Sequence, residues 1–233
     1  MPLSPAEILI VPALLRREQI LRSMGILSGR SVKNRLLRHV DEAVERVAAH
    51  ARPRLAWIRG TADEISTVLD RSRRLDRYLA EADHVVIMAA TAGREMDALI
   101  LSEADPMRRY VLSVASTALT RYALEFAESE LGERFPMCST GKPLSPGNDG
   151  LPLGLQRGLI ELLPIDAIGI DFDHGLKLMT PLASITAIIG LGSYVWSEGE
   201  GCRSCPSPNC PIRLHENLGS APRHALTPTL STN

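Results

Sequence analysis

Three of the four cysteines of this 233-residue chain lie within nine consecutive positions, in the segment GCRSCPSPNCPIR (201–213). Cys202, Cys205 and Cys210 follow the pattern Cys-x-x-Cys-x-x-x-x-Cys, and only Cys138 lies elsewhere. Two thiolates with this spacing in a turn-forming segment can reach one metal ion, and a third five residues further on can join them. The pattern predicts a zinc or Fe–S site, because thiolates suit both. Its fourth position is left to Cys138, a histidine, solvent or a cluster iron's partner.

A reduced loop without metal is the alternative interpretation of these cysteines, and a disulfide is the least favoured. The opening stretch MPLSPAEILIVPALLRREQ has no basic region, and Pro12 interrupts its apolar run, unlike a secretory signal. No apolar run approaches the roughly 20 residues of a spanning helix. We therefore expect a cytoplasmic protein, in which thiols stay reduced.

The composition is that of a globular protein, with 45% hydrophobic and 23% charged residues. The formal net charge is -1, which argues against a broad electrostatic surface for nucleic acid or for anionic membranes. The length suits one large domain or two small ones. We expect a single domain over 1–214, followed by a disordered tail over 215–233 that is polar and has no hydrophobic period.

Two short segments outside the cysteine cluster have residues that could carry chemistry. In DFDH, Asp171 and Asp173 share one face of a strand, where two carboxylates could bind a metal or an amine. The solvated side of an edge strand is the favoured interpretation of that pair. TAGREM (91–96) could place an anion at a helix N-terminus, although one glycine there more often marks an ordinary tight turn. No Walker A, dinucleotide or nucleophile-elbow motif is present.

The order of predicted elements indicates the fold class. One helix stands out: Asp105 is a good N-cap, Pro106 suits the first turn, and Gly132 is expected to end it. A loop rich in proline and glycine follows over 136–154. The remaining expectations are strands over 7–11, 53–60, 84–93, 167–173 and 184–193, and helices over 16–25, 31–51 and 155–164. This order predicts an α+β fold with helices packed on a largely antiparallel, twisted sheet.

Taken together, these segments resemble the activation (reactivation) domain of cobalamin-dependent methionine synthase, in its stand-alone form. The resemblance lies in RREQILRSMG, in VVIMAATAGREMDALI followed by the long helix, in LSPGNDGLPLGLQRGLIELL, and in IGIDFDHGLKLMTPLASITAIIGLG. The cysteine cluster before Arg213 is also typical of stand-alone members. The resemblance extends from about Glu7 to Arg213 and depends on the order of the motifs.

The resemblance implies an accessory protein of a corrinoid methyltransferase or methionine synthase system. Such a domain binds S-adenosylmethionine in a shallow groove beside its Pro-Gly loop and supports reductive methylation of cobalamin held by a partner. A flavoprotein or a ferredoxin would supply the electron. The chain has no cobalamin-binding Asp-x-His-x-x-Gly segment of its own, so the corrinoid must come from the partner. Whether the chain itself counts as an enzyme is left open.

The resemblance places the ligand site on the loop and on two flanking positions. The residues implied are Ser145, Pro146, Gly147, Asn148 and Asp149 of the loop, with Lys142 and Glu125 nearby. Asp149 and Glu125 are the candidates for pairing with the methionyl amine. Pro143 and Asn148 stand where the family usually has an arginine and a tyrosine, and Lys142 is adjacent. Two alternatives therefore remain: a metal- or Fe–S-binding electron-transfer protein, and a docking partner of a corrinoid protein that has lost S-adenosylmethionine binding.

Overall fold

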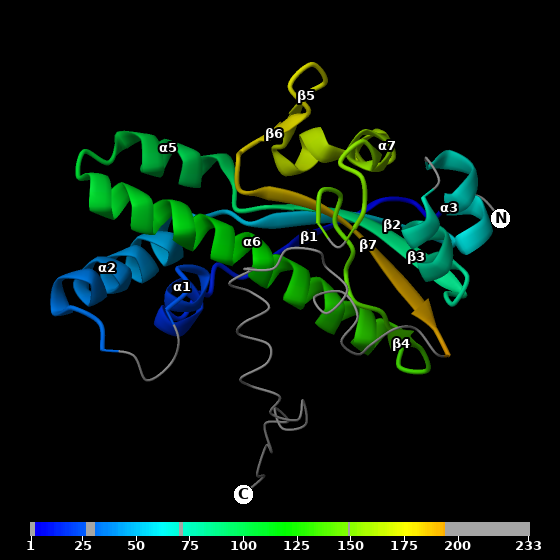
Figure 1. Ribbon diagram of the computed structural model, residues 1–233, viewed down its shortest axis with the longest axis horizontal. Helices are drawn as coiled ribbons and strands as arrows, with labels where there is room; N and C mark the ends of the chain where they lie inside the picture. The colour runs from blue at the N-terminus through cyan, green and yellow to red at the C-terminus, as the bar shows by residue number, and fades with distance from the viewer. Residues whose placement is uncertain (1–2, 27–30, 70–71, 149, 194–233) are drawn as a thin grey trace, which may run out of the picture.

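A five-stranded antiparallel sheet in the order β1-β2-β3-β7-β4 forms the centre of the computed structural model (Figure 1). The structure describes residues 3–26, 31–69, 72–148 and 150–193. The strands of the sheet are β1 (Glu7–Ile10), β2 (Arg54–Thr61), β3 (His84–Thr91), β7 (Ser184–Gly192) and β4 (Ser139–Thr140). All of these strand pairs are antiparallel, as expected from the sequence.

The central strands β3 and β7 are apolar on both faces because helices and loops cover both sides of the sheet. Every residue of β3 after His84 is buried, and Ile87 pairs with Ile188 of β7 in the middle of the sheet. Such a continuous apolar run is characteristic of a strand covered on both faces. The expectation of a buried central strand over 84–93 is confirmed.

Helices of very different lengths surround the sheet. They are α1 (Arg17–Ser23), α2 (Asn34–His50), α3 (Ala62–Val68), α4 (Arg73–Leu79), α5 (Arg94–Ser102), α6 (Pro106–Arg134) and α7 (Leu155–Glu161). A 3-10 turn, η1 (Ile165–Ile168), and a small hairpin of β5 (Asp171–Asp173) and β6 (Leu178–Thr180) follow α7. In Figure 1 the hairpin and α7 lie on one side of the sheet, while α6, α1 and α2 lie on the other.

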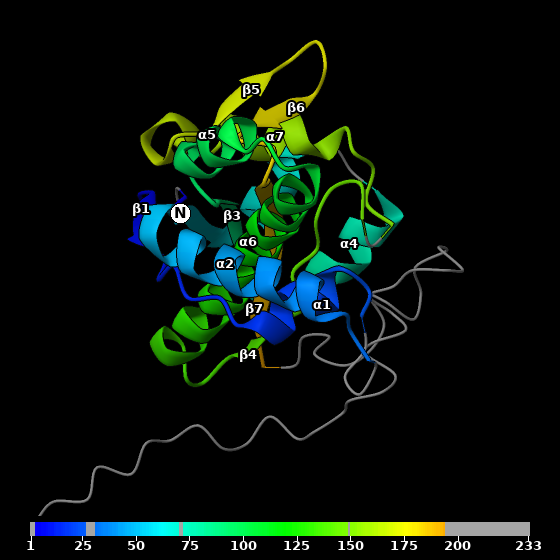
Figure 2. The same cartoon turned by 90° about the vertical axis from the view of Figure 1, so that its left-hand side faces the viewer.

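The core has three parts that follow this layering. The long helix α6 packs its C-terminal half on the sheet through Ala123, Ala127 and Leu131. Its N-terminal half is buried against α1 and α2 through residues such as Val111 and Leu119. The opposite face of the sheet packs on α3, α4, α7 and the loop that precedes α7. Figure 2 shows α2 and α1 outside α6, on the side away from the hairpin.

The beginning of α6 follows the prediction from the sequence. The Asp105 carboxylate accepts hydrogen bonds from the backbone N–H groups of Met107 and Arg108, at 2.8 and 2.9 Å. These bonds keep the pKa of Asp105 below its usual value, with the contact to the Arg108 N–H as the main cause. The helix continues through Gly132 to Arg134, two residues past the predicted end, and Gly132 is not among the glycines with a positive φ.

Some elements around this framework differ from those predicted. The strand predicted over 167–173 is wrong in its first half, where a 3-10 turn ends at Gly169 in a left-handed conformation, φ 81°. The short helices α3 and α4 and the strands β4 and β6 were not expected, whereas the strand-to-helix turn predicted at TAGREM does lead into α5. The predicted domain boundary at 214 and the tail over 215–233 lie outside the described residues. None of the described helices has the length and apolarity that crossing a bilayer requires.

Candidate functional site

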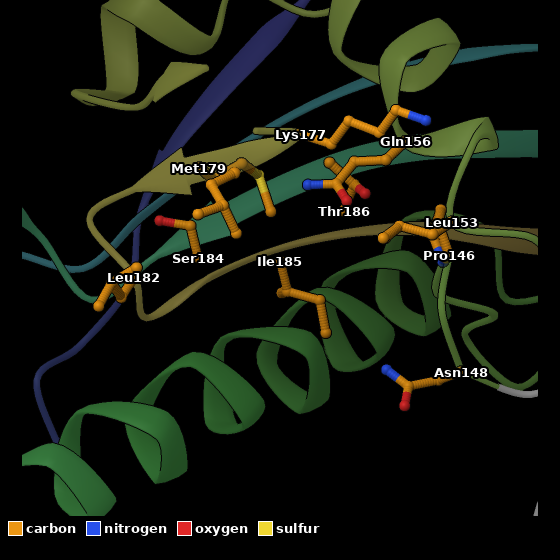
Figure 3. A pocket seen from close by; sticks show the side chains of 11 residues that line it. Pro146, Asn148, Leu153, Gln156, Lys177, Met179, Leu182, Ser184, Ile185 and Thr186 are labelled. Atoms are coloured by element: carbon orange, nitrogen blue, oxygen red, sulfur yellow. The ribbon is translucent and has the colours of Figure 1, made fainter. Parts of the chain in front are cut away.

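A shallow groove of about 290 Å³ lies along the outer edge of β7, below the β5–β6 hairpin (Figure 3). Its volume is near the lower end of the roughly 300–1,000 Å³ typical of small-molecule sites. The loop before α7, α7 itself, the hairpin and β7 all contribute to its walls. The lining residues are Pro146, Asn148, Leu153, Gln156, Lys177, Leu178, Met179, Leu182, Ser184, Ile185 and Thr186.

The first half of β7 has an open edge at this groove. The short strand β4 pairs only with Leu191 and Gly192, and the loop residue Leu144 exchanges both backbone hydrogen bonds with Ile188. Backbone groups alternate in direction along an antiparallel strand. The N–H and C=O of Thr186 therefore point outward like those of Ile188, but no strand of the described chain covers them. The groove thus offers a backbone donor and acceptor beside an apolar wall.

Local turns set the shape of the loop on the lower wall. The Asn148 N–H donates to the Ser145 carbonyl at 3.0 Å, and the Gly147 N–H donates to the Leu151 carbonyl at 3.0 Å. Gly147 has φ 82°, a conformation that glycine adopts without steric cost. A β-carbon at Gly147 would lie 3.3 Å from the Leu153 side chain, which lines the groove. The loop therefore holds its backbone close to the groove wall at this point.

A buried tyrosine attaches this loop to the sheet. The Tyr78 hydroxyl donates to the Lys142 carbonyl at 2.8 Å and accepts from the Gly190 N–H at 2.8 Å. Tyr78 is only 3% exposed, so these bonds are shielded from water. These bonds fix the start of the loop, at Lys142, to β7. The helix α4, which carries Tyr78, was not expected from the sequence.

The structure brings only part of the predicted ligand site into the groove. Pro146 and Asn148 line it, while Ser145 is buried. Gly147 does not line the groove, but a β-carbon there would meet the lining residue Leu153. Glu125 is exposed on α6 and is not among the lining residues.

The two remaining predicted residues differ in what the structure says of them. Lys142 is held through its carbonyl by Tyr78, and its side chain does not line the groove. Asp149 lies outside the described residues. Neither of the positions flanking the loop, 125 and 142, therefore contributes a lining side chain.

Sequence reasoning missed most of the upper wall. Lys177, Met179 and Leu182 come from the hairpin and the segment after it, about 30 residues beyond the loop in sequence. Gln156 comes from α7 and is only 7% exposed. One local signal could have found Gln156. It lies in the first turn of the helix that directly follows the Pro-Gly loop, and the first turn of such a helix is close to the loop.

The two other segments with candidate chemistry have structural roles in the described chain. Asp171 pairs with Arg94 at 2.7 Å, and the Asp173 carboxylate accepts from the N–H groups of Gly175 and Leu176. Gly93 adopts φ 97°, and a β-carbon there would approach the Arg52 carbonyl to 2.9 Å. The tight-turn interpretation of TAGREM therefore accounts for its glycine.

The predicted metal ligands Cys202, Cys205 and Cys210 lie outside the described residues. Cys138 is described, is partly buried and carries a free thiol. It directly precedes β4, whose Ser139 pairs with Gly192 at the end of β7. Within the ranges that the structure describes, no cluster of three or more histidine, cysteine or carboxylate side chains could hold a metal ion.

Comparison with known proteins supports the fold. No protein-family model and no curated protein matches the sequence. Among solved structures, the chain is similar to the crystal structure of the MetH reactivation domain bound to AdoHcy. The TM-score is 0.54 at 16% sequence identity, and the match covers 84% of this chain and 80% of that one. The chain therefore has the α+β fold of the MetH reactivation domain.

Proposed function

We propose that this protein binds S-adenosylmethionine in the groove along β7 and supports reductive methylation of a corrinoid carried by a partner protein. The carrying observation is the position of the groove: it lies between the Pro-Gly loop and the open edge of β7, in a fold that holds AdoHcy in a solved structure. AdoHcy is S-adenosylhomocysteine, which S-adenosylmethionine becomes when it gives up its methyl group.

The lining of the groove suits such a ligand. Leu153, Met179 and Ile185 offer apolar and polarisable contacts to an adenine ring and to sulfur. The outward N–H and C=O of Thr186 offer the donor and acceptor pair that an adenine edge or an amino-acid end can use. The described residues therefore fit the ligand in size and in polarity.

The rim of the groove favours a protein partner above it. Four leucines on or beside the rim are 49–75% exposed: Leu153, Leu176, Leu178 and Leu182. Gathered apolar side chains on a surface indicate an interaction site. A corrinoid protein docked there could bring its cofactor to the methyl group, and the groove residues would hold and orient the methyl donor.

Ligand titration with a matched pair of loop variants tests the first half of the proposal. Gly147 and Gly150 both have a positive φ, at 82° and 77°, but only a side chain at 147 would meet the groove residue Leu153. Wild-type protein and Gly150→Trp should bind S-adenosylmethionine and S-adenosylhomocysteine in calorimetric titration, and Gly147→Trp should not. Absence of binding to the wild-type protein, or equal loss in both variants, contradicts the proposed site.

A second assay addresses the methyl transfer. Free cobalamin, a one-electron reductant and S-adenosylmethionine are mixed with and without the protein, and the visible spectrum is followed. A rate of methylcobalamin formation that increases with protein concentration supports the proposal. If Gly147→Trp gives the same rate as wild type, any effect of the protein on methylcobalamin formation does not depend on the groove.

The alternative function rests on the position of Cys138. Because Ser139 pairs with Gly192, Cys138 lies beside the point where the described chain ends, at Ser193. Cys202 follows nine residues later, a length that spans up to about 30 Å when extended. We propose zinc or an Fe–S cluster on Cys202, Cys205 and Cys210 with Cys138 as the fourth ligand. An Fe–S cluster there would favour an electron-transfer or docking role.

A further inference from the structure

Among the described residues that line the groove, one has a charged side chain, Lys177. The other ten lining residues are apolar or neutral, and the neutral polar ones are Asn148, Gln156, Ser184 and Thr186. A single charge in such a site fixes the orientation of any ligand that has an opposite charge at one end. The position of Lys177 therefore matters more to recognition than its exposure on the surface suggests.

The hairpin holds Lys177 in an unusual backbone conformation. Its φ is 55°, and it is the one non-glycine residue of the described chain with a positive φ. A lysine has a steric cost in this left-handed region that a glycine would avoid. The turn before it is fixed by the Asp173 carboxylate, which accepts from the Gly175 and Leu176 N–H groups at 2.8 and 2.9 Å.

The Lys177 ammonium has no protein partner in the described chain. No carboxylate there lies within ion-pair distance of it, although acidic residues are close in sequence. Asp171 pairs with Arg94, and Asp173 is occupied by the turn. Figure 3 shows the Lys177 side chain extending from the hairpin toward Gln156 of α7, at one end of the groove. The ammonium is thus available to a ligand.

The opposite end of the groove has a different character. Leu182 and Met179 lie there, beside Ser184 (Figure 3). The nearby charge is negative, since the Asp97 carboxylate accepts from the Leu182 N–H at 3.2 Å, and a ligand carboxylate is disfavoured at this end. An elongated ligand with an apolar ring and a carboxylate therefore has one favourable orientation, with the carboxylate toward Lys177. S-adenosylmethionine and S-adenosylhomocysteine both have this character.

We infer that Lys177 recognises the carboxylate of the ligand's amino-acid end and makes the groove selective for adenosyl amino acids over adenosine thioethers without a carboxylate. This inference rests on the proposed function. It assigns the charge contact to a residue of the hairpin, whereas the resemblance in sequence pointed to Lys142. Lys177 lines the groove and Lys142 does not. The two can be separated experimentally, because the chain has only three lysines, the third being Lys33.

The experiment compares two ligands across four proteins by calorimetric titration. The ligands are S-adenosylhomocysteine and its decarboxylated analogue, which keeps the amine and lacks the carboxylate. The proteins are wild type, Lys177→Met, Lys177→Arg and Lys33→Met, where the last is a matched surface control. Lys177→Met should weaken S-adenosylhomocysteine binding about three- to tenfold, as expected for a partly exposed charge pair, and leave the analogue unchanged.

Three further results separate recognition from a structural effect. Lys177→Arg should retain most of the affinity, because it keeps the charge, and Lys33→Met should behave as wild type. The wild-type preference for S-adenosylhomocysteine should shrink as salt is raised, and the preference of Lys177→Met should not. Equal weakening of both ligands by Lys177→Met would indicate a loss of hairpin structure and overturn the inference.

The outcomes also separate this inference from the proposed function. If wild type binds S-adenosylhomocysteine and Lys177→Met binds it equally well, the function stands and the inference falls. A Lys142→Met variant that alone loses the carboxylate preference would move the contact to the loop and also overturn it. If wild type binds neither ligand, both the proposed function and the inference fall.

Discussion

Replacing Tyr78 by phenylalanine should loosen the groove's lower wall without touching its lining. The hydroxyl of Tyr78 joins the Lys142 carbonyl to the Gly190 N–H, at 2.8 Å on each side. Phenylalanine keeps the ring and therefore creates no cavity. The substitution removes this bridge, so its effect measures how strongly the loop is attached to β7.

The expected magnitude follows from the burial of the two partners. Gly190 is buried in the sheet, so its N–H would be left without a partner, at a cost of about 1–3 kcal/mol. Lys142 is half-buried, and its carbonyl can turn to water at little cost. We expect a total loss of about 1–3 kcal/mol in the free energy of unfolding. For a protein of this size, this lowers Tm by about 2–4 °C for each kcal/mol.

Chemical denaturation of Tyr78→Phe beside Tyr110→Phe is the appropriate assay. Tyr110 is 51% exposed on α6, so its substitution should change stability by less than about 0.5 kcal/mol. Hydrogen exchange should also increase at the amides near the end of β7 in Tyr78→Phe alone. If the two variants unfold at the same denaturant concentration, the hydroxyl bridge does not hold the loop and the reasoning is refuted.

Three other predictions test separate parts of the protein. Asp105→Ala should lower Tm by a few degrees in thermal unfolding while Asp105→Asn does not, because both asparagine and aspartate cap helices; equal Tm values would show that the cap contributes nothing. The Arg46 guanidinium holds the pKa of Glu103 below its usual 4.5. The ion pair of Glu103 with Arg46 therefore stabilises the folded protein above that pH, and this contribution is lost as pH falls through the lowered pKa. The Tm difference between wild type and Glu103→Gln should therefore shrink on acidification, and a constant difference would contradict the assignment. Protein purified without oxygen should contain about one equivalent of zinc or a visible Fe–S chromophore. The metal content should be lower in Cys202→Ser and in Cys138→Ser, and an unchanged metal content in Cys138→Ser would exclude Cys138 as a ligand.

The parts of the fold that sequence predicted are those whose signal is local and long. The helix α6 is predicted by a capping aspartate, a proline in the first turn and apolar residues at helical spacing over many turns. The strand β3 has eight residues, nearly all apolar. The strand β4 has two residues and β6 has three, too few to show a period. The helix α3 did have a signal, since Thr61 and Glu64 form a capping box, but its seven residues carry no clear apolar face.

The candidate site divides in the same way. The loop residues Pro146 and Asn148 were expected, because clustered prolines and glycines mark a loop that needs a special backbone. Lys177 could not be located from spacing, because only the tertiary arrangement of the hairpin beside β7 brings it to the groove. Tyr78 belongs to α4, a helix that was not expected from the sequence. Its function depends on one hydroxyl meeting two backbone groups that lie 64 and 112 residues further along the chain.

The openness of the groove is a requirement of the proposed function. A methyl donor enclosed on all sides would be protected from water, but a corrinoid on another protein could not reach it. The groove instead has one polar strand edge, one charged residue and a rim of exposed leucines, so its ligand stays accessible from above. A partner that covers those leucines would exclude water at the moment when the methyl group is transferred. In the proposed function, the same apolar rim that is unfavourable in the free protein would couple docking to the reaction.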